Sequence, residues 1–457
     1  MSGGAVAQGR RRGRPDPARR VAYDTVRTVH AADGYANLVL SDILGERRLD
    51  VRDAAFATEL AYGTLRSEGT YDLILAAAAG RSLGTLQPAV VDVLRLGAHQ
   101  VLGMRVPAHA AVAATVDLAA AAIGERVAGL VNAVLRKVAR NDLETWLADL
   151  VGDGQGIDAV AARNHHPAWI ARAFANVIGD ETEAALEADN VPPRTSLVVR
   201  PGLYDRAALV EAGAEPTPYS PFGAIWHGNP SDVPAVRDGR VGVQDEGSQL
   251  VALLLSRAEA PRGPWLDLCA GPGGKAALLA GLAQEQGDAL MASERQPHRA
   301  TLVAAALRAY TPAPLVVAAD ATRPAWRPGS FARVLADVPC TGLGALRRRP
   351  EARWRRQPSD LDDLVPLQKA LLRTAVASLV PGGVVAYVTC SPHVTETDEI
   401  ISAILTDGDV DVVEASALLP EVPDAARGPY LQLWPHRHGT DAMFCAVLRR
   451  RDTDAAR

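Results

Sequence analysis

The first third of the chain carries apolar residues at intervals of three and four, the spacing of helices that bury one face. Several glycines and Pro107 interrupt this pattern. The pattern predicts helices over residues 18–30, 54–65, 71–79, 88–97, 108–123 and 126–139. We therefore expect an all-α domain of five to seven helices over residues 18–145.

The segments on either side of this domain have different patterns. Residues 1–17 show no apolar periodicity and are rich in arginine, which predicts a disordered basic tail. Residues 146–240 combine a helical pattern over 167–177 and 181–188 with a short alternating strand at 196–200, followed by loops rich in proline. We expect a small α/β adaptor domain over residues 146–240.

Short apolar runs alternate with amphipathic stretches over residues 241–450. The runs predict strands over residues 265–269, 289–293, 315–319, 333–337, 384–390, 410–414 and 443–448. The stretches between them predict helices, notably over residues 275–286, 297–309 and 361–379. Strands that alternate with helices of this length favour a doubly wound parallel sheet. The fold class expected for this part is therefore α/β, with a Rossmann-like sheet.

Composition limits the class of protein. Hydrophobic residues make up 48% and charged residues 22%, as in ordinary soluble proteins. The four cysteines form no CxxC pair, which argues against structural zinc and disulfides and fits a reducing cytosol. No segment resembles a signal peptide, and the longest apolar stretch, near residues 110–124, is broken by Asp117. We expect a cytoplasmic monomer with no membrane span and no metal.

Charge is distributed unevenly along the chain. The net charge is −5, but residues 347–356 carry six arginines against one glutamate. A local basic patch on an acidic body suits a directed contact with RNA or DNA, although a solvated charge run has the same composition. We expect the arginine run and Trp354 to offer a phosphate-binding and base-stacking surface, with Arg200 adding a further RNA contact.

The turn that follows the first strand of the expected sheet, residues 267–275, is rich in glycine and suits a nucleotide-like cofactor. A P-loop needs Ser or Thr after its lysine, but Ala276 follows Lys275 here, which argues against ATP. A dinucleotide site needs a third glycine that is missing, and Pro272 removes a backbone N–H that would face a pyrophosphate. S-adenosylmethionine has no phosphates, so the loop favours this cofactor.

Acidic residues follow the next two strands. Glu294 suits the ribose hydroxyls and Asp320 the adenine, although NAD would use the same acid at the ribose. The expected cofactor-binding residues are Cys269, Ala270, Gly271, Pro272, Gly273, Gly274, Lys275, Glu294, Arg299, Asp320 and Asp337.

Cys340 and Cys390 each follow an apolar run that ends at the same edge of the expected sheet. Free cysteines are most often small core residues, and the two positions taken alone favour that interpretation. A thiolate is also a strong nucleophile, and two thiols beside one cofactor suggest covalent chemistry with separate attack and release steps. Asp337, next to Cys340, favours the second interpretation.

Four segments together resemble the RNA 5-methylcytosine methyltransferases, and within them the bacterial ribosomal Sun/RsmB type. The segments are DLCAGPGGK (267–275), DVPCTGLG (337–344), RRRPEARW (347–354) and YVTCSP (387–392). Residues 243–249 and 438–444 agree with the same family. The helical domain, with residues 130–136, resembles the NusB-like RNA-binding domain of this subfamily.

The resemblance implies transfer of a methyl group from S-adenosylmethionine to C5 of a cytosine in ribosomal RNA of the small subunit, 16S RNA. It implies that Cys390 is the nucleophile that adds to C6 and that Cys340 assists the elimination that frees the product. Asp337 would hydrogen-bond the N3/N4 edge of the base, and Lys275 would lie near enough to lower a thiol pKa.

The chain departs from the family's usual residues at three positions. Gly271, Ala276 and Thr341 stand where the family usually has Ala, Thr and Ser. Each exchange is small for small and removes no reactive group, so the expected cofactor is unchanged.

Two other functions are open at this point. An amino-group methyltransferase of the same fold would place an aromatic residue where this chain has Cys340. An RNA-binding or antitermination module with an inactive Rossmann domain would lack the cysteines or the glycine loop, and both are present. The histidines are expected to be structural or to face phosphates rather than to bind metal, because no ligand partners stand at the required spacing; they are His165, His166, His436 and His438.

Overall fold

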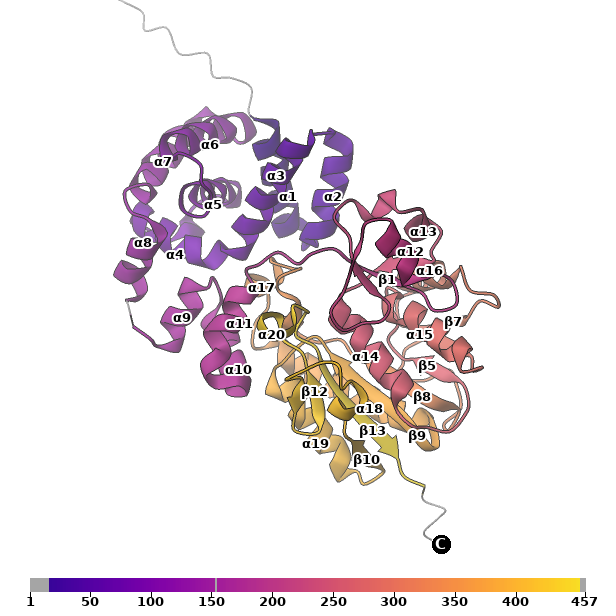
Figure 1. Ribbon diagram of the computed structural model, residues 1–457. Coiled ribbons are helices and arrows are strands. Elements are labelled where there is room, and N and C mark those ends of the chain that lie inside the picture. The colour runs from indigo at the N-terminus through magenta and orange to yellow at the C-terminus, as the bar shows by residue number, and fades with distance from the viewer. Residues whose placement is uncertain (1–15, 153, 453–457) are drawn as a thin grey trace, which may run out of the picture. The chain divides into compact units, whose positions relative to one another are not determined.

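The computed structural model describes residues 16–152 and 154–452, which divide into two compact units (Figure 1). The helical unit comprises the described residues up to Arg172 together with Arg348–Arg355. The sheet unit comprises Ala173–Arg347 and the described residues from Arg356 onward. A short segment of the second half of the chain therefore belongs to the fold of the first.

The helical unit is built from helices, most of which bury an apolar stripe. They are α1 (Pro17–Ala32), α2 (Ala36–Arg47), α3 (Val51–Arg66), α4 (Glu68–Ala79), α5 (Pro88–Leu102), α6 (Ala108–Ala122), α7 (Glu125–Val138), α8 (Leu143–Val151), α9 (Ile157–Arg163) and α17 (Ala352–Arg355). Val26, Leu65, Leu94 and Leu135 are buried in one core shared by α1, α3, α5 and α7. Burial of such side chains contributes about 1.5–3 kcal/mol each, and this holds the helices together.

The six helices predicted from apolar spacing are α1 and α3–α7, which confirms the all-α character of this region. Helix α2 escaped prediction because only Ala36 and Leu40 are buried in it, so its sequence has no apolar stripe. The expected disordered tail does not reach residue 17. Helix α1 begins at Pro17, where Asp16 accepts a hydrogen bond from the Arg19 backbone N–H at 2.9 Å. Residues 1–15 of that tail lie outside the described residues.

The helical unit continues past the boundary that we expected near residue 145. Helix α8 packs against α4, and α9 packs against α8, so both helices belong to this unit. Helix α10 (Ala168–Ile178) begins in the helical unit and ends in the sheet unit. The adaptor expected from residue 146 is thus limited to the residues after Arg172, and it lies in the same compact unit as the larger sheet.

The adaptor region contains a small antiparallel sheet in the order β2-β3-β1-β4. Its elements are α11 (Thr182–Ala188), β1 (Ser196–Val199), α12 (Arg206–Glu211), β2 (Glu215–Pro216), β3 (Gly223–Ile225), α13 (Pro234–Arg237) and β4 (Val241–Val243). Leu197, Val199, Leu209 and Val241 form its own small core. The predicted strand at 196–200 is β1, the central strand of this sheet.

The larger sheet has the order β11-β12-β13-β9-β8-β5-β6-β7, and β10 pairs with β13. Its strands are β5 (Trp265–Asp267), β6 (Leu290–Glu294), β7 (Leu315–Ala318), β8 (Phe331–Asp337), β9 (Leu379–Thr389), β10 (Val410–Val413), β11 (Ala426–Arg427), β12 (Tyr430–Gln432) and β13 (Phe444–Arg450). The strands from β9 to β7 are parallel. Strand β13, expected in a parallel sheet, runs antiparallel to its partners β9 and β10, so the sheet is mixed.

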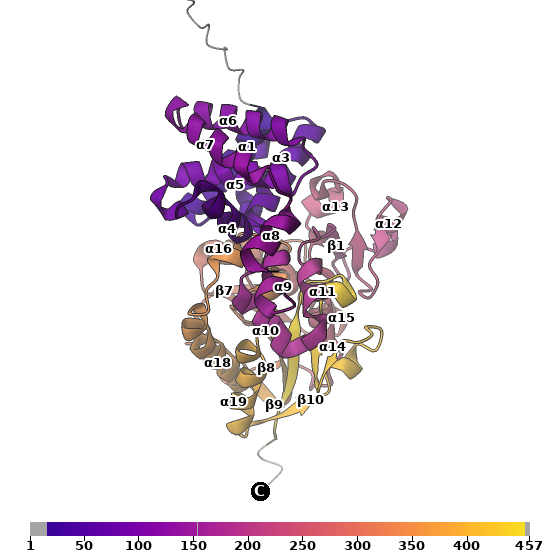
Figure 2. The same cartoon turned by 90° about the vertical axis from the view of Figure 1, so that its left-hand side faces the viewer.

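Helices cover both faces of this sheet. They are α14 (Glu246–Arg257), α15 (Gly274–Glu285), α16 (Pro297–Leu307), α18 (Asp360–Ser378), α19 (Asp398–Thr406) and the short α20 (Pro435–His438). Along β9 the side chains alternate, with Ala386 in the core under α14 and α15 and Tyr387 in the core under α18 and α19. Figure 2 shows α18 and α19 on one side of β8 and β9 and α14 and α15 on the other. The doubly wound fold is thereby confirmed.

The strand order reverses at β5, which pairs with β6 on one side and β8 on the other. In open α/β sheets, ligands bind beyond the carboxyl ends of the strands at such a reversal. The residues that follow these ends are the glycine-rich loop after β5, Glu294 at the end of β6, and Asp337 at the end of β8. The fold thus brings most of the predicted site residues to one edge.

Candidate active site

The loop after β5 turns tightly into α15, which begins at Gly274. Gly273 has a φ of +110°, and its N–H donates to the Ala270 carbonyl at 2.7 Å. A Cβ on Gly273 would stand 2.6 Å from the Ala306 Cβ, so α16 leaves room only for glycine. Cys269, Ala270, Gly271, Pro272 and Gly273 therefore pass closely over the neighbouring helix, and their backbone lines the edge of the sheet.

Glu294 anchors this loop. Its Oε2 accepts a hydrogen bond from the Gly271 N–H at 3.1 Å, and its Oε1 accepts one from the Gln296 N–H at 2.9 Å. Arg299, one turn into α16, donates from Nη2 to the Gly271 carbonyl at 2.7 Å. The three predicted residues Gly271, Glu294 and Arg299 are thus brought together. Each Glu294 oxygen keeps a second lone pair with which it could accept from a ribose hydroxyl.

Asp320 follows β7 at the same edge. Its Oδ1 accepts hydrogen bonds from the Thr322 N–H at 2.9 Å and the Thr322 hydroxyl at 2.7 Å. These bonds lower the pKa of Asp320, so it is ionised at neutral pH. Its side chain is 41% exposed and can accept from the exocyclic amine of an adenine.

Lys275 and Asp337 form an ion pair at the centre of the edge, with 2.9 Å between Nζ and Oδ2. Burial alone would lower the pKa of Lys275, but the adjacent Asp337 carboxylate and Cys390 raise it. Lys275 is therefore a permanent cation held between Asp337 and the thiols. Its primary contact is with Asp337 and not with a cysteine.

Asp267, the last residue of β5, belongs to this group although its role was not predicted. Both of its oxygens are buried and lack a hydrogen-bond partner of normal geometry in the described part of the chain. Burial and the nearby Asp337 charge raise its pKa to about 8. Its position as the first residue of the glycine-rich motif was the signal that could have identified it.

The orphaned acceptors fit the methionine end of S-adenosylmethionine, which carries an ammonium group. Asp267 supplies two of them, and the buried Gln244 Oε1 is a third that has no described partner. Gln244 Oε1 would lie 3.9 Å from a Cβ placed on Gly274, so it borders the glycine loop. Buried acceptors without donors are costly, and a bound ammonium would satisfy them.

Cys340 and Cys390 meet at the ends of neighbouring strands. Their sulfur atoms are 3.4 Å apart, and both residues are half-buried. The contact with Cys390 and burial raise the pKa of the Cys340 thiol well above its usual range. Cys340 therefore stays protonated at neutral pH and can donate to the Cys390 sulfur. The prediction that Lys275 lowers a thiol pKa does not hold for Cys340.

A buried arginine joins three of the motifs. Arg347 donates to the Asp245 carboxylate at 2.8 Å and to the Asp441 carboxylate at 2.7 Å, and its side chain is 7% exposed. Asp245 belongs to the stretch at 243–249, and Asp441 belongs to the stretch at 438–444. Arg347 therefore ties these two stretches to the loop that carries Cys340.

Several side chains that we expected to contact RNA instead make hydrogen bonds to other parts of the protein. Arg353 is fully buried in the helical unit and donates to the His165 carbonyl at 3.1 Å. Trp354 donates from its indole N–H to the Arg66 carbonyl at 2.8 Å. Arg200, expected to contact RNA, is also buried, and its guanidinium donates to the carbonyls of Gly239 and Ala306. Charge alone did not show that these side chains point inward.

The histidines expected to be structural are held by protein groups. His438 accepts from the Trp434 N–H at 2.9 Å and lies 2.9 Å from the Pro423 carbonyl, and His436 lies 3.1 Å from Glu181. His165 and His166 lie in the helical unit, where burial lowers the pKa of both. Within residues 16–152 and 154–452, no group of three or more His, Cys, Asp or Glu is arranged to hold a metal ion.

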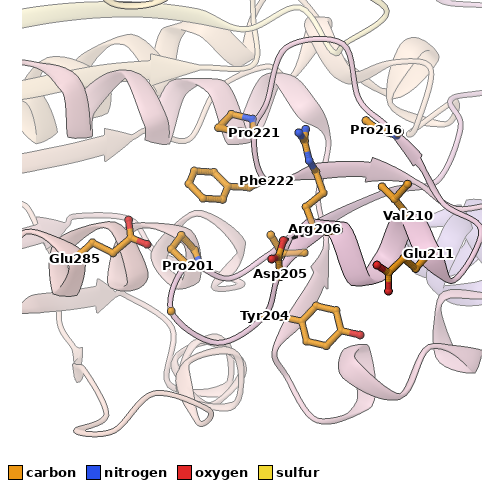
Figure 3. Close-up of a pocket in the computed structure, with 13 residues that line it drawn as sticks. Pro201, Tyr204, Asp205, Arg206, Val210, Glu211, Pro216, Pro221, Phe222 and Glu285 are labelled. Atoms are coloured by element: carbon orange, nitrogen blue, oxygen red, sulfur yellow. Dashed lines mark hydrogen bonds between the residues drawn. The ribbon is translucent and has the colours of Figure 1, made fainter.

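An open depression of about 860 Å³ lies on the adaptor region (Figure 3). Tyr204, Asp205 and Arg206 border it at the start of α12, and Phe222 and Glu285 face it from other elements. None of the described residues that line it belongs to the predicted catalytic or cofactor-binding set. The predicted residues therefore lie at the sheet edge and not around this depression.

Comparison with known proteins agrees with the site. The sequence model of a family described as 16S rRNA methyltransferase RsmB/F matches residues 252–449, and that of the NusB family matches residues 16–140. A putative methyltransferase of Mycobacterium tuberculosis is 48% identical over 97% of this chain and 99% of its own length. The ribosomal RNA small subunit methyltransferase B of Pseudomonas putida is 34% identical over 78% of this chain and 82% of its own length.

The chain belongs to the RsmB/F methyltransferase family. It is a methyltransferase of the Sun/RsmB type, with a NusB-like region before the Rossmann-like sheet, and its cofactor is S-adenosyl-L-methionine. The crystal structure of a protein titled PH0851 has the same fold, with a TM-score of 0.80 and 20% identity over 95% of this chain and 98% of that chain. No helix among the described residues of this family member has the length and apolar character needed to cross a bilayer.

Proposed function

We propose that this methyltransferase modifies C5 of a cytosine in ribosomal RNA of the small subunit, through a covalent bond between Cys390 and C6 of the base. The observation that carries the proposal is the pair of thiols 3.4 Å apart beside the Lys275–Asp337 ion pair. One thiol suffices for a nucleophile, so a second thiol in contact with it favours a reaction with distinct attack and release steps. The relatives named as ribosomal RNA methyltransferases support RNA as the substrate.

The residues would share the binding of the cofactor and the base. Asp267 and Gln244 would accept from the ammonium group of S-adenosylmethionine, Glu294 from its ribose, and Asp320 from its adenine. When bound, this cofactor supplies an electrophilic methyl group. Asp337, paired with Lys275, would accept from the N3/N4 edge of a cytosine that has been turned out of its stack.

The cysteines would perform the covalent steps. The Cys390 thiolate adds to C6, and the new C–S bond makes C5 electron-rich enough to accept a methyl group. The C5 proton then passes to water, the electron pair of the C5–H bond forms the C5–C6 double bond again, and the C6–S bond breaks with its electron pair left on the Cys390 sulfur. The protonated Cys340 thiol donates to the departing Cys390 sulfur, which stabilises the leaving thiolate.

The experiment compares three variants incubated with small-subunit ribosomal RNA and S-adenosylmethionine. Cys340→Ala should accumulate a protein–RNA band that survives denaturation, whereas Cys390→Ala should form none and should transfer no methyl group. Cys445→Ala is the matched control, because this cysteine is buried in β13 and has no assigned role. Activity in Cys390→Ala, or the absence of a band in Cys340→Ala, contradicts the assigned roles.

Analysis of the methylated nucleoside separates this proposal from its alternative. 5-Methylcytosine supports it, and N4-methylcytosine would show an amino-group methyltransferase. Action as a cytoplasmic monomer stays a prediction, which light scattering of the purified chain would test for the oligomeric state.

A further inference from the structure

A fully buried carboxylate lies behind the loops that carry the two cysteines. Glu396 closes the short 3-10 helix η5 (Val394–Glu396), which follows Cys390 in the chain. Its Oε1 accepts from the Thr341 backbone N–H at 2.8 Å, and its Oε2 accepts from the Thr341 hydroxyl. The Thr341 hydroxyl also lies 3.1 Å from that of Ser391. The Glu396 carboxylate therefore contacts Thr341, the residue after Cys340. The Thr341 hydroxyl in turn contacts Ser391, the residue after Cys390.

A glutamine from another element completes the arrangement. Gln368 of α18 is fully buried, and its Nε2 donates to Glu396 Oε1 at 3.0 Å and to the Pro339 carbonyl at 2.9 Å. Both neighbours of Cys340 in the chain, Pro339 and Thr341, are thus fixed by the same pair of side chains. The Cys340 backbone has little freedom to move while these bonds are made.

Glu396 is also held to the sheet by its backbone. Tyr387, in the core of β9, donates from its hydroxyl to the Glu396 carbonyl at 2.8 Å. The Cys390 carbonyl accepts from the Gly344 N–H at 2.8 Å, and the Gly344 carbonyl accepts from the Ala442 N–H at 2.8 Å. The loops of Cys340 and Cys390 are therefore joined on the side away from Glu396 as well.

Burial of a carboxylate is costly, and the described partners of Glu396 are neutral donors. A carboxylate accepts hydrogen bonds at both of its oxygens, whereas an amide in the same place accepts only at its oxygen and donates from its nitrogen. The arrangement is therefore suited to fixing a loop and not to balancing a charge.

We propose that Glu396, with Gln368, is a positioning residue that sets the distance between the two cysteine sulfurs and thereby controls release of the product. The role in product release rests on the proposed function, whereas the sulfur–sulfur distance can be tested without it. Thr341, which stands where the family usually has serine, keeps the hydroxyl that the clamp needs. We define the clamp as Glu396, Gln368 and Thr341.

The first test uses the covalent RNA adduct. Glu396→Gln should lower steady-state turnover by about 10-fold to 100-fold, the effect of losing a hydrogen bond to a charged group. The first methyl transfer should slow by less than about threefold, so the adduct accumulates as in Cys340→Ala. A purely structural role would slow both steps together. Equal losses in the two steps overturn the proposal.

Thr341 provides a milder pair of variants in case Glu396→Gln does not fold. Thr341→Val keeps the shape and loses the hydroxyl, and Thr341→Ser keeps the hydroxyl and loses the methyl group. Accumulation of adduct in Thr341→Val but not in Thr341→Ser supports the clamp. Identical behaviour of the two variants contradicts it.

The second test measures the distance between the sulfurs and needs no RNA. Diamide, an azo oxidant, takes two hydrogens from a pair of thiols and is reduced to its hydrazine while one disulfide forms. Peptide mapping would follow the Cys340–Cys390 disulfide, with Cys269 and Cys445 as internal references. The disulfide should form at least about 10-fold more slowly in Glu396→Gln and Thr341→Val than in Thr341→Ser and the unmodified chain.

An unchanged or faster rate in those variants overturns the clamp. Failure of Cys340→Ala to form an RNA adduct overturns the proposed function, and the disulfide rate still decides the clamp. The two failures are therefore distinguishable.

Discussion

At the scale of the residue, Lys275 is the side chain on which the electrostatics of the site depend. Its ammonium lies 2.9 Å from Asp337 and also acts on Cys390. Replacement by methionine keeps the length of the side chain and removes the charge, which leaves Asp337 close to the orphaned Asp267 without a cation. We expect Lys275→Met to lower kcat by about 100-fold or more, the usual cost of losing one preorganised charge in an active site.

Steady-state kinetics would check this prediction, and kcat should fall by a larger factor than the KM for S-adenosylmethionine rises, because the Lys275 ammonium contacts Asp337. Lys137→Met is the control, since Lys137 lies exposed on α7 in the helical unit. A kcat close to that of the unmodified chain would mean that Asp337 does not need its ion pair.

Residues at the ends of strands could be predicted from the sequence, and residues behind them could not. Asp337, Cys340 and Cys390 each follow an apolar run, so their position at the sheet edge follows from the strand pattern. Glu396 and Gln368 are separated from Thr341 by 55 and 27 residues and meet it only in the folded chain. In the local sequence, Glu396 resembles a surface residue at the end of a helix, and Gln368 resembles a surface residue within a helix.

At the scale of the element, the turn before α15 contains two glycines, Gly271 and Gly273, whose surroundings differ. A Cβ on Gly273 would meet the Ala306 Cβ at 2.6 Å and the Val303 Cα at 3.0 Å, at a φ of +110°. A Cβ on Gly271 would meet the ends of two flexible side chains, the Glu294 carboxylate at 2.0 Å and the Arg299 guanidinium at 2.8 Å, which can rotate away. We expect Gly273→Ala to weaken S-adenosylmethionine binding by about 10-fold or more, since strain of this kind costs about 1–3 kcal/mol.

Gly271→Ala is the matched variant, and the family usually has alanine there. Its dissociation constant should stay within about threefold of the unmodified value, as isothermal titration would show. Equal losses in the two variants would contradict the distinction between a rigid backbone neighbour and a mobile side chain.

Helices α1, α4 and α5 share a network of charged side chains centred on His30. Its Nδ1 lies 2.8 Å from Asp92 and its Nε2 lies 3.1 Å from Glu68. Burial alone would lower the pKa of His30, but the two carboxylates raise it to about 9. Because the pKa is raised in the folded state, the stabilisation is complete below pH 6.5, the unfolded value, and is lost as the pH rises to 9.

We therefore expect the free energy of unfolding to fall by about 3 kcal/mol between pH 6 and pH 9.5, since each unit of pKa shift is worth about 1.4 kcal/mol. Amide hydrogen exchange in α1, α4 and α5 of the full chain would measure this in the helical unit, because Asp267 of the sheet unit, with a pKa of about 8, titrates over the same pH interval. His30→Gln should be less stable than the unmodified chain at pH 6 and should lose most of the pH dependence. A pH dependence that persists in His30→Gln would assign it to another group.

Element types were predictable wherever a segment has a regular apolar pattern. Strands β5 and β6 were placed within two residues because they are short runs bounded by turns. Strands β11 and β12 have two and three residues and form only through pairing with β13, so no local pattern announces them. The antiparallel direction of β13 is defined relative to its partner β9, so the sequence of β13 alone could not predict it.

At the scale of the whole molecule, the arginine run shows where sequence patterns are ambiguous. A solvated face, an RNA surface and a buried capping segment have the same composition. In the structure, Arg355 donates to the Gly34 carbonyl at 3.0 Å and pairs with Asp33 at 2.8 Å, at the C-terminal end of α1. The indole N–H of Trp354 donates to the Arg66 carbonyl at the end of α3. Cations and donors at helix C-termini are favourable because the last carbonyls there lack partners.

Substitution of Trp354 would distinguish an RNA surface from a buried capping segment. A Cβ on Gly69 would stand 2.2 Å from the indole ring, so the ring packs directly on the start of α4. Trp354→Ala would remove that contact and the hydrogen bond to Arg66. Loss of a fully buried tryptophan costs about 3–5 kcal/mol, and this ring is half-buried, so we expect the helical unit to lose about 2 kcal/mol.

Hydrogen exchange of the amides in α3 and α4 would measure the loss, with exchange accelerated by about 30-fold for 2 kcal/mol. Trp354→Phe keeps an aromatic ring on Gly69 and loses only the indole N–H, so it should cost about 1 kcal/mol, the net value of one hydrogen bond. If Trp354→Ala leaves exchange unchanged and instead weakens RNA binding, the ring is a stacking platform, as its composition first suggested. If exchange rises in the expected order, the run of arginines around Trp354 is a structural part of the helical unit, and the RNA contacts must lie on other surfaces.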